Sequence, residues 1–168
     1  MATVITYKNS ESYHLPGVVK LADMAFGEGY LTLELACEIS NFLVALDVDR
    51  VIGYAFNTVE DGVGNISHVV VDPRYRGRGI GTELVKRSVE ILATYDISRV
   101  ESQAWQRSDN RVVPLASALE ANGFSRIKYL PNFYNLDHSE DVPCNVCGNV
   151  CTCGAWQYEL QVNEQDTL

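Results

Sequence analysis

The sequence lacks the features that membrane-spanning or secreted chains carry. No stretch approaches the roughly 18 consecutive apolar residues of a transmembrane helix. The N-terminus has no basic segment followed by an apolar one, so no signal peptide is indicated. We therefore expect a cytoplasmic chain with no membrane partner. Its 168 residues, 46% of them apolar, suffice for one hydrophobic core, and we predict a single domain over residues 1–168.

Positive charge is also scarce, with 13 Lys and Arg against 22 Asp and Glu and a net charge of -9. This balance argues against a nucleic-acid partner. The negative field would gather cationic partners such as amines, polyamines or lysine-rich peptides, although solubility alone also explains it. The arginines at positions 74, 76 and 78 are a local exception, which marks their segment as a candidate anion site.

This arginine segment lies between an expected strand and an expected helix. Val69–Val71 are β-branched and favour extended backbone, and Asp72-Pro73 ends the strand. A helix begins near Ile80, so its first N–H groups point outward at a glycine-rich loop and can bind phosphate oxygens. A dinucleotide-binding G-x-G-x-x-G would need glycine where Thr82 stands, and a P-loop would need Gly-Lys-Ser/Thr. The pattern predicts a pyrophosphate cradle of another kind.

The run Arg76-Gly77-Arg78-Gly79-Ile80-Gly81, preceded by V-x-P, resembles the R/Q-x-x-G-x-G/A acetyl-coenzyme A loop of the GCN5-related N-acetyltransferases (GNAT). The resemblance implies an α/β (α+β) fold with a mixed, mostly antiparallel central sheet flanked by helices. It also implies acetyl-coenzyme A as co-substrate. The pantetheine arm of the co-substrate would pair with the main chain of Val69, Val70 and Val71, and Asn110 would also contact the co-substrate. Its pyrophosphate would be bound by Arg76, Gly77, Arg78, Gly79, Ile80, Gly81 and Thr82.

The expected elements follow the order of that family. They are strand 3–7, helices 12–26 and 32–39, strands 42–46 and 51–60, the central strand, a helix from Ile80 to near Tyr95, strand 99–106, helix 114–122, and strands 126–134 and 155–162. The match departs from the family at Ala118-Leu119, where relatives often carry a Leu-Tyr pair whose tyrosine protonates the departing thiolate. This departure supports an alternative reading, an acyl-coenzyme A-sensing or partner-binding module.

The residues expected at the acceptor come from the resemblance. Phe26 and Tyr30 fall in the segment that shapes the acceptor pocket, and Phe133-Tyr134 resembles the aromatic pair with which amino-terminal protein acetyltransferases flank a peptide end. Glu101 is the candidate base, acting through water, and Tyr134 the candidate acid or peptide contact. We expect His68, which alternates with Ile66 and Val70, to be a core histidine, and Cys37 to lie in the core.

Four cysteines lie close together before the last expected strand, at Cys144, Cys147, Cys151 and Cys153. A C-x-x-C followed by C-x-C can place four thiolates around one tetrahedral ion, the geometry that zinc prefers. Disulfides are not expected in a cytoplasmic chain, and an iron–sulfur centre or a redox pair are further alternatives. His138 is a second-choice ligand. We predict a structural zinc in an insertion over residues 137–154.

Together these features predict transfer of an acetyl group from acetyl-coenzyme A to a primary amine. The acceptor would be a peptide or protein, at its N-terminus or a lysine, or a small polyamine-like molecule. A homodimer is left open.

Overall fold

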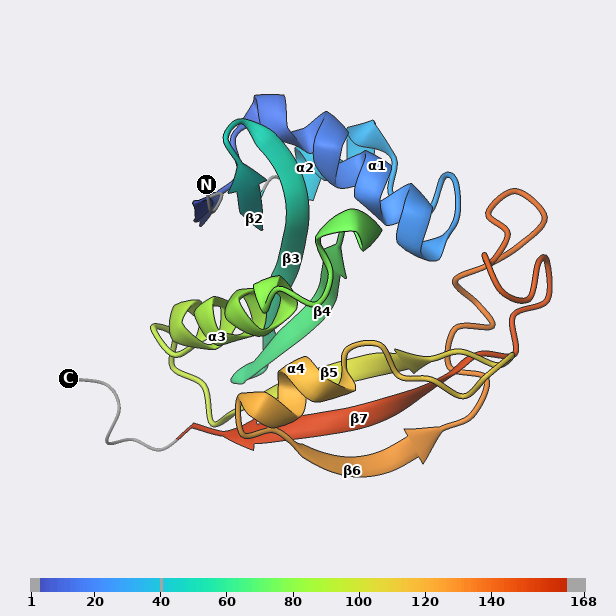
Figure 1. Cartoon of the computed structure of the whole chain (residues 1–168). Coiled ribbons are helices and arrows are strands. Elements are labelled where there is room, and N and C mark those ends of the chain that lie inside the picture. The colour runs from blue at the N-terminus through green and yellow to red at the C-terminus, as the bar shows by residue number, and fades with distance from the viewer. Residues whose placement is uncertain (1–3, 40, 163–168) are drawn as a thin grey trace.

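A seven-stranded sheet in the order β1-β2-β3-β4-β5-β7-β6 forms the centre of the molecule (Figure 1). The computed structural model describes residues 4–39 and 41–162. The strands are β1 (Ile5–Asn9), β2 (Phe42–Asp47), β3 (Arg50–Glu60), β4 (Val63–Val71), β5 (Arg99–Gln106), β6 (Ser125–Leu130) and β7 (Gly154–Gln161). All neighbours are antiparallel except β4 and β5. The expected mixed, mostly antiparallel sheet is confirmed.

The helices cover both faces of this sheet. They are α1 (Leu15–Phe26), α2 (Leu33–Ile39), α3 (Ile80–Leu92) and α4 (Ala116–Ala121), with short 3₁₀ turns η1 (Ser12–His14) and η2 (Pro73–Tyr75). The expected first helix thus begins with a 3₁₀ turn, and α3 and α4 are shorter than expected. The strand expected to reach Tyr134 ends at Leu130, since the chain turns at Asn132, whose φ is +52°. Thr3, expected in β1, lies outside the described residues.

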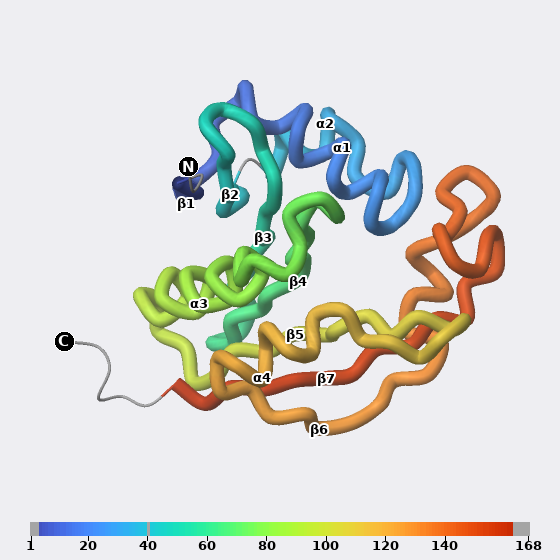
Figure 2. The backbone as a smooth tube through the Cα atoms, in the orientation of Figure 1, coloured from blue at the N-terminus to red at the C-terminus, as the bar shows by residue number. Residues whose placement is uncertain are grey.

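The parallel neighbours β4 and β5 stay together over only three residue pairs. Val63 pairs with Arg99, Gly64 with Val100 and Asn65 with Glu101. Beyond these pairs the strands separate, as the tube in Figure 2 shows, while β4 continues to pair with β3 and β5 with β7. The sheet therefore opens in its middle.

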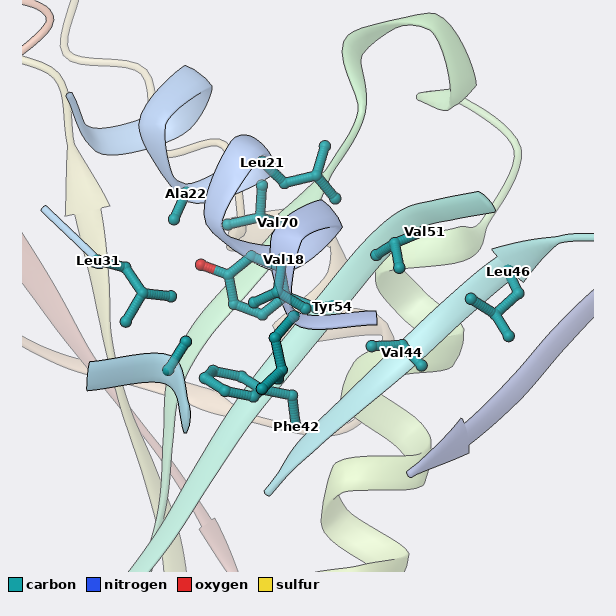
Figure 3. Packing of buried hydrophobic residues seen from close by; sticks show 12 residues of the cluster. Val18, Leu21, Ala22, Leu31, Phe42, Val44, Leu46, Val51, Tyr54 and Val70 are labelled. Carbon is teal, nitrogen blue, oxygen red and sulfur yellow. The ribbon is translucent and has the colours of Figure 1, made fainter. Parts of the chain in front are cut away.

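Apolar side chains pack on both faces of the sheet. Val18, Leu21 and Ala22 of α1 pack with Val44, Tyr54 and other residues on one face (Figure 3). On the other face α3 packs through Ile80 and Leu84 on Leu43, Ala45, Ile52 and Ala55, and α3 and α4 enclose a further cluster around Leu119 and Tyr158. In the described part of the chain, no helix has both the length and the apolar character needed to cross a membrane.

A β-bulge in β4 corrects one expectation about its faces. Phe56 pairs with His68, but the next residue, Asn57, pairs with Ile66, so Ser67 is an extra residue. Ile66 consequently packs with α3 and α4, whereas Val70 packs beneath α1 and His68 contacts Phe26. The expectation that Ile66 and His68 share a face was therefore wrong. Cys37, expected in the core, is exposed because α2 buries only Ala36.

Candidate functional site

A cleft of about 510 Å³ lies where β4 and β5 separate. The Ser102 hydroxyl donates a hydrogen bond to the Ile66 carbonyl at 2.9 Å, just beyond the last β4–β5 pair, and the cleft begins there. One wall, the loop wall, is formed by lining residues between the end of β4 at Val71 and the first turn of α3 at Thr82. A second group of lining residues, the aromatic wall, consists of Met24–Phe26, His68, Trp105, Tyr134 and Asn145. The two walls meet along the unpaired edges of β4 and β5.

The loop wall presents backbone rather than side chains. Gly77 and Gly79 have φ values of +73° and +77°, and Gly79 forms the left-handed N-cap of α3. A Cβ added at either glycine would meet no heavy atom within 4 Å, so the backbone there faces open space. The N–H groups of Ile80, Gly81 and Thr82 have no acceptor within α3, because the first turn of a helix offers none. This geometry fits an anion such as a pyrophosphate.

The arginines of this wall differ in their surroundings. Arg76 lines the cleft, and its Nε donates to the carbonyl of Val71 at 3.2 Å. Arg78 lies over the ring of Tyr75, 5.2 Å from its centroid, and is not a lining residue. Arg74 donates to the buried carboxylate of Asp72 at 2.7 Å. Of the two arginines predicted to bind the cofactor, the structure places Arg76 in the cleft. The predicted residues Val69–Val71, Gly77 and Gly79–Thr82 also line it.

Asn110 lies elsewhere. Its Oδ1 accepts a hydrogen bond from the N–H of Val112 at 2.9 Å in the exposed loop after β5, and it is not a lining residue. The start of α4 lines the cleft instead, through Ser117 and Ala118 among others. Leu119, where relatives would have the thiolate-protonating tyrosine, is fully buried in the core.

The aromatic wall gathers rings from four segments of the chain. Phe26 and Tyr30 were both predicted at the acceptor, and their ring centroids lie 4.9 Å apart with the rings tilted by 41°. Phe26 lines the cleft, whereas Tyr30 lies behind it and is not a lining residue. The ring of His68 lies 5.1 Å from that of Phe26 and 5.7 Å from that of Tyr30. Nδ1 of His68 is 3.4 Å from the Tyr54 hydroxyl. Burial lowers the pKa of His68 to about 4 and raises the pKa of Tyr30 to about 12, with the charge of Asp137 adding to the second shift. At neutral pH the imidazole is uncharged and the phenol keeps its proton.

The two predicted proton carriers occupy different positions. Tyr134 lines the cleft, and its hydroxyl donates to the Gln103 carbonyl at 2.8 Å; burial raises the pKa of this phenol. Glu101 lies at the last β4–β5 pair, its carboxylate is bonded to Arg99 Nε at 2.7 Å, and it is not a lining residue. Phe133 packs edge-on against Tyr134 at 5.0 Å and is partly exposed outside the lining. No Asp or Glu is among the described residues lining the cleft.

The four predicted cysteines converge beside the aromatic wall. The sulfur atoms of Cys144, Cys147, Cys151 and Cys153 all lie within 4.8 Å of one another, and none of them forms a disulfide. Three of these side chains are buried. The structure therefore places four potential thiolate ligands around a single point, as a tetrahedral ion requires.

The surroundings of the four sulfurs differ, because burial raises the pKa of Cys151 and Cys153 whereas hydrogen bonds reach the sulfurs of Cys144 and Cys147. Cys144 and Gly148 exchange two backbone hydrogen bonds of 2.9 Å, which close a tight turn with φ +77° at Gly148. The N–H groups of Val146 and Thr152 point at the sulfurs of Cys144 and Cys147, each at 3.4 Å. Although burial opposes ionisation, hydrogen bonds with Ser108 and Thr152 lower the pKa of Cys147 to about 6.

Sequence reasoning missed several residues of the cleft. His68, expected in the core, does pack against Phe26, Tyr54 and Phe56, and it also lines the cleft, which the pattern did not indicate. Trp105 and Asn145 come from the end of β5 and from the cysteine segment, and only the folded chain brings them to one wall. The position of Asn145 between two metal-ligand candidates was the one available hint.

Comparisons with known proteins agree with this geometry. The family model described as "Acetyltransferase (GNAT) family" matches residues 16–124. No curated protein sequence matches. Solved structures with the same fold include Ard1 from Thermoplasma volcanium, at 19% identity over 95% of this chain and 99% of that one, with a TM-score of 0.71.

Two further structures with a similar fold have names that mention a protein or a peptide. The ribosomal-protein-S18-alanine N-acetyltransferase from Escherichia coli is 15% identical over 96% of this chain and 97% of its own, with a TM-score of 0.68. A chain of the NatC complex bound to Gag peptide and CoA is 18% identical over 95% of this chain and 99% of its own, with a TM-score of 0.67.

Proposed function

The chain belongs to the acetyltransferase (GNAT) family, and from this premise we propose that it transfers the acetyl group of acetyl-coenzyme A to a primary amine on a peptide or protein. The observation that carries the proposal is the loop wall, where backbone amides face an open cleft at the beginning of α3. Those amides and Arg76 would bind the pyrophosphate. The unpaired edge of β4 at Val69–Val71 would pair with the pantetheine arm, and a main-chain N–H there would polarise the thioester carbonyl.

The choice of a peptide or protein acceptor is supported by the aromatic wall. The rings of Phe26, Trp105 and Tyr134, from separate segments, line the cleft and would offer apolar surface to a chain that carries the amine. Burial raises the pKa of Tyr30 and Tyr134, and the nearby carboxylate of Asp137 adds to both shifts, so one acidic group lies near this wall for a cationic acceptor. The fold is shared with enzymes whose names describe protein or peptide substrates.

The proton transfers are assigned to residues within the cleft. The amine nitrogen forms a bond to the acetyl carbon, the carbon–sulfur bond breaks, the amine loses a proton and the thiolate gains one. We assign the base to His68, the neutral imidazole of the lining, whose Nδ1 lies 3.4 Å from the Tyr54 hydroxyl. The role requires the tautomer in which Nδ1–H donates to Tyr54 and Nε2 accepts the amine proton. Tyr134, which keeps its proton, is assigned as the acid. Glu101, paired with Arg99 outside the lining, has no part in this assignment.

Acetyl transfer is tested by incubating the chain with acetyl-coenzyme A and three probes. The probes are peptides with free N-termini, N-terminally blocked peptides with one lysine, and spermidine, and the readouts are release of coenzyme A thiol and the mass of the acceptor. We expect release with the first class. Binding of acetyl-coenzyme A without release for any probe would contradict transfer and favour the sensing module.

The assigned base is tested with a matched pair of variants. His68→Gln is expected to lower kcat by about 100-fold, the usual contribution of a positioned base. Glu101→Gln is expected to change it less than about twofold. The reverse ranking would return the base to Glu101. Tyr134→Phe is expected to lower kcat about tenfold, and a normal rate would remove the acid role.

We further propose that the four cysteines hold a structural zinc ion. The donor set is four thiolates, which zinc prefers, and it leaves no position open for a substrate. Elemental analysis of protein produced in zinc-supplemented medium should find one zinc per chain, and Cys151→Ser should remove it. Iron, or no metal in the unmodified chain, would contradict the proposal.

A further inference from the structure

The cysteine segment between β6 and β7, residues 131–153, contacts more than its own cluster. Asn145 Nδ2 donates to the Met24 carbonyl at 3.0 Å and lies 3.4 Å from the Asp23 carbonyl. The ring of His138 lies 5.5 Å from that of Tyr30. The Ser108 hydroxyl, after β5, is 3.0 Å from Cys147 Sγ. In Figures 1 and 2 this segment, in orange and red, lies beside the α1–α2 loop.

The bonds made by Asn145 complete the end of a helix. The last carbonyls of an α-helix have no partner within it and need donors from outside. Gly27 donates its N–H to the Asp23 carbonyl at 3.0 Å, but Met24 has no such partner from the following turn, and Asn145 supplies one from more than a hundred residues away. Met24 and Asn145 both line the cleft. The bond therefore joins two parts of the aromatic wall.

The packing around this bond is close. A Cβ added to Gly27 would lie 2.2 Å from the Pro143 carbonyl oxygen, so the cysteine segment and the α1–α2 loop touch backbone to backbone. Residues 131–153 contain no helix or strand and only one isolated bridge, between Cys144 and Gly148. Such a segment would lose much conformational entropy on docking unless another constraint orders it. Ligation of the four sulfurs to one ion supplies that constraint.

From this arrangement we propose that Asn145 is a positioning residue of the acceptor site, which anchors the end of α1 to the metal-bound segment and so builds the aromatic wall. The inference rests on the proposed acetyl transfer and the proposed zinc. It assigns the cysteine segment to the acceptor half of the cleft. The loop wall is independent of that segment, because within the described chain no hydrogen bond joins residues 71–82 to the four cysteines.

The test compares Asn145→Ala with Asn149→Ala, since both asparagines are exposed and belong to the same segment, but the Asn149 side chain forms no hydrogen bond within the described chain. We expect Asn145→Ala to raise amide hydrogen exchange of residues 24–31 about tenfold, the loss of one hydrogen bond. Affinity for acetyl-coenzyme A should change less than twofold in both variants. For a peptide with a free N-terminus, Asn145→Ala should raise KM about tenfold with little change in kcat. Chelation of the metal should increase the same exchange.

The outcomes separate this inference from the earlier proposals. Unchanged exchange of residues 24–31 in Asn145→Ala would overturn it, and so would an equal effect in Asn149→Ala. Absence of bound metal in the unmodified chain would contradict the proposed zinc. The exchange comparison between Asn145→Ala and Asn149→Ala would still test the Asn145–Met24 hydrogen bond. Absence of transfer to any amine would contradict the proposed enzyme without altering the exchange result.

Discussion

The two walls of the cleft are built by different means. The loop wall comes from one uninterrupted stretch, residues 71–82, and offers main-chain N–H groups held in place by two left-handed glycines. The aromatic wall combines side chains from α1, β4, β5 and the cysteine segment. Its geometry depends on contacts such as Asn145 to Met24 that join distant parts of the chain. One wall is thus a local property of the sequence, and the other is a property of the assembled fold.

This difference means that the walls should respond separately to substitution. Changes in the loop wall should affect acetyl-coenzyme A and leave the acceptor half intact. Changes in the aromatic wall should lower the free energy of unfolding and raise KM for the acceptor, and should leave the affinity for acetyl-coenzyme A unchanged. The variants that follow test this separation.

The largest effect is expected from Gly79→Asp. It forces a side chain into a residue with φ +77° and places a carboxylate where the pyrophosphate would lie. Loss of two charge-assisted hydrogen bonds corresponds to at least about 100-fold in affinity for acetyl-coenzyme A, measured by calorimetry. Gly62→Asp is the control, because Gly62 has a similar φ of +74° in the turn between β3 and β4. An equal loss of affinity in both variants would point to general unfolding.

Gly27→Ala should break the aromatic wall without touching the loop wall. The new Cβ would lie 2.2 Å from the Pro143 oxygen, and φ is +121°. We expect a loss of about 3 kcal/mol in the free energy of unfolding, measured with denaturant. At Gly29, with φ +81° and its nearest neighbours 4.0 Å away, alanine should cost about 1 kcal/mol. Similar losses would show that the cysteine segment does not dock there.

A smaller effect is expected from pH at His68. Its pKa is lowered to about 4 in the folded chain, below the ordinary value of 6.5, so the unfolded chain binds more protons between these values. Stability is therefore highest above pH 6.5 and falls as the pH decreases toward 4, by about 2 kcal/mol at pH 5. His68→Gln should remove this part of the pH dependence of unfolding. An unchanged profile would mean that the imidazole is hydrated in the folded chain.

The smallest effect should come from the arginines. Arg76→Gln is expected to weaken acetyl-coenzyme A binding about tenfold, since one charge-assisted hydrogen bond is lost while the backbone amides stay. Arg78→Gln should change the affinity less than twofold, because Arg78 stacks on Tyr75 outside the lining. A larger loss of affinity in Arg78→Gln than in Arg76→Gln would indicate that the phosphates bind on the outer side of the loop, beside Arg78.

The same contrast explains how much the sequence predicted. The loop wall, the order of strands and helices, and the convergence of the cysteines followed from local patterns: β-branched runs, glycines beside arginines, and cysteine spacing. Asn110 and Glu101 were placed by analogy of position and lie outside the lining. The face of Ile66 depended on a one-residue bulge, which periodicity does not show. Contacts across the cleft, such as that of Asn145, depend on tertiary packing alone.

Because β4 and β5 pair over only three residues, ligand binding should affect the stability of the whole molecule. This pairing links two halves of the sheet, with the Ser102 hydroxyl and an Asn122 bond to the Thr82 carbonyl among the other ties between them. The extended pantetheine arm of acetyl-coenzyme A, lying between β4 and β5, would replace the contacts that these strands do not make with each other. Bound acetyl-coenzyme A would then hold the two halves of the sheet together. The complex should therefore have a higher melting temperature than the free protein, by an amount set by the affinity for acetyl-coenzyme A.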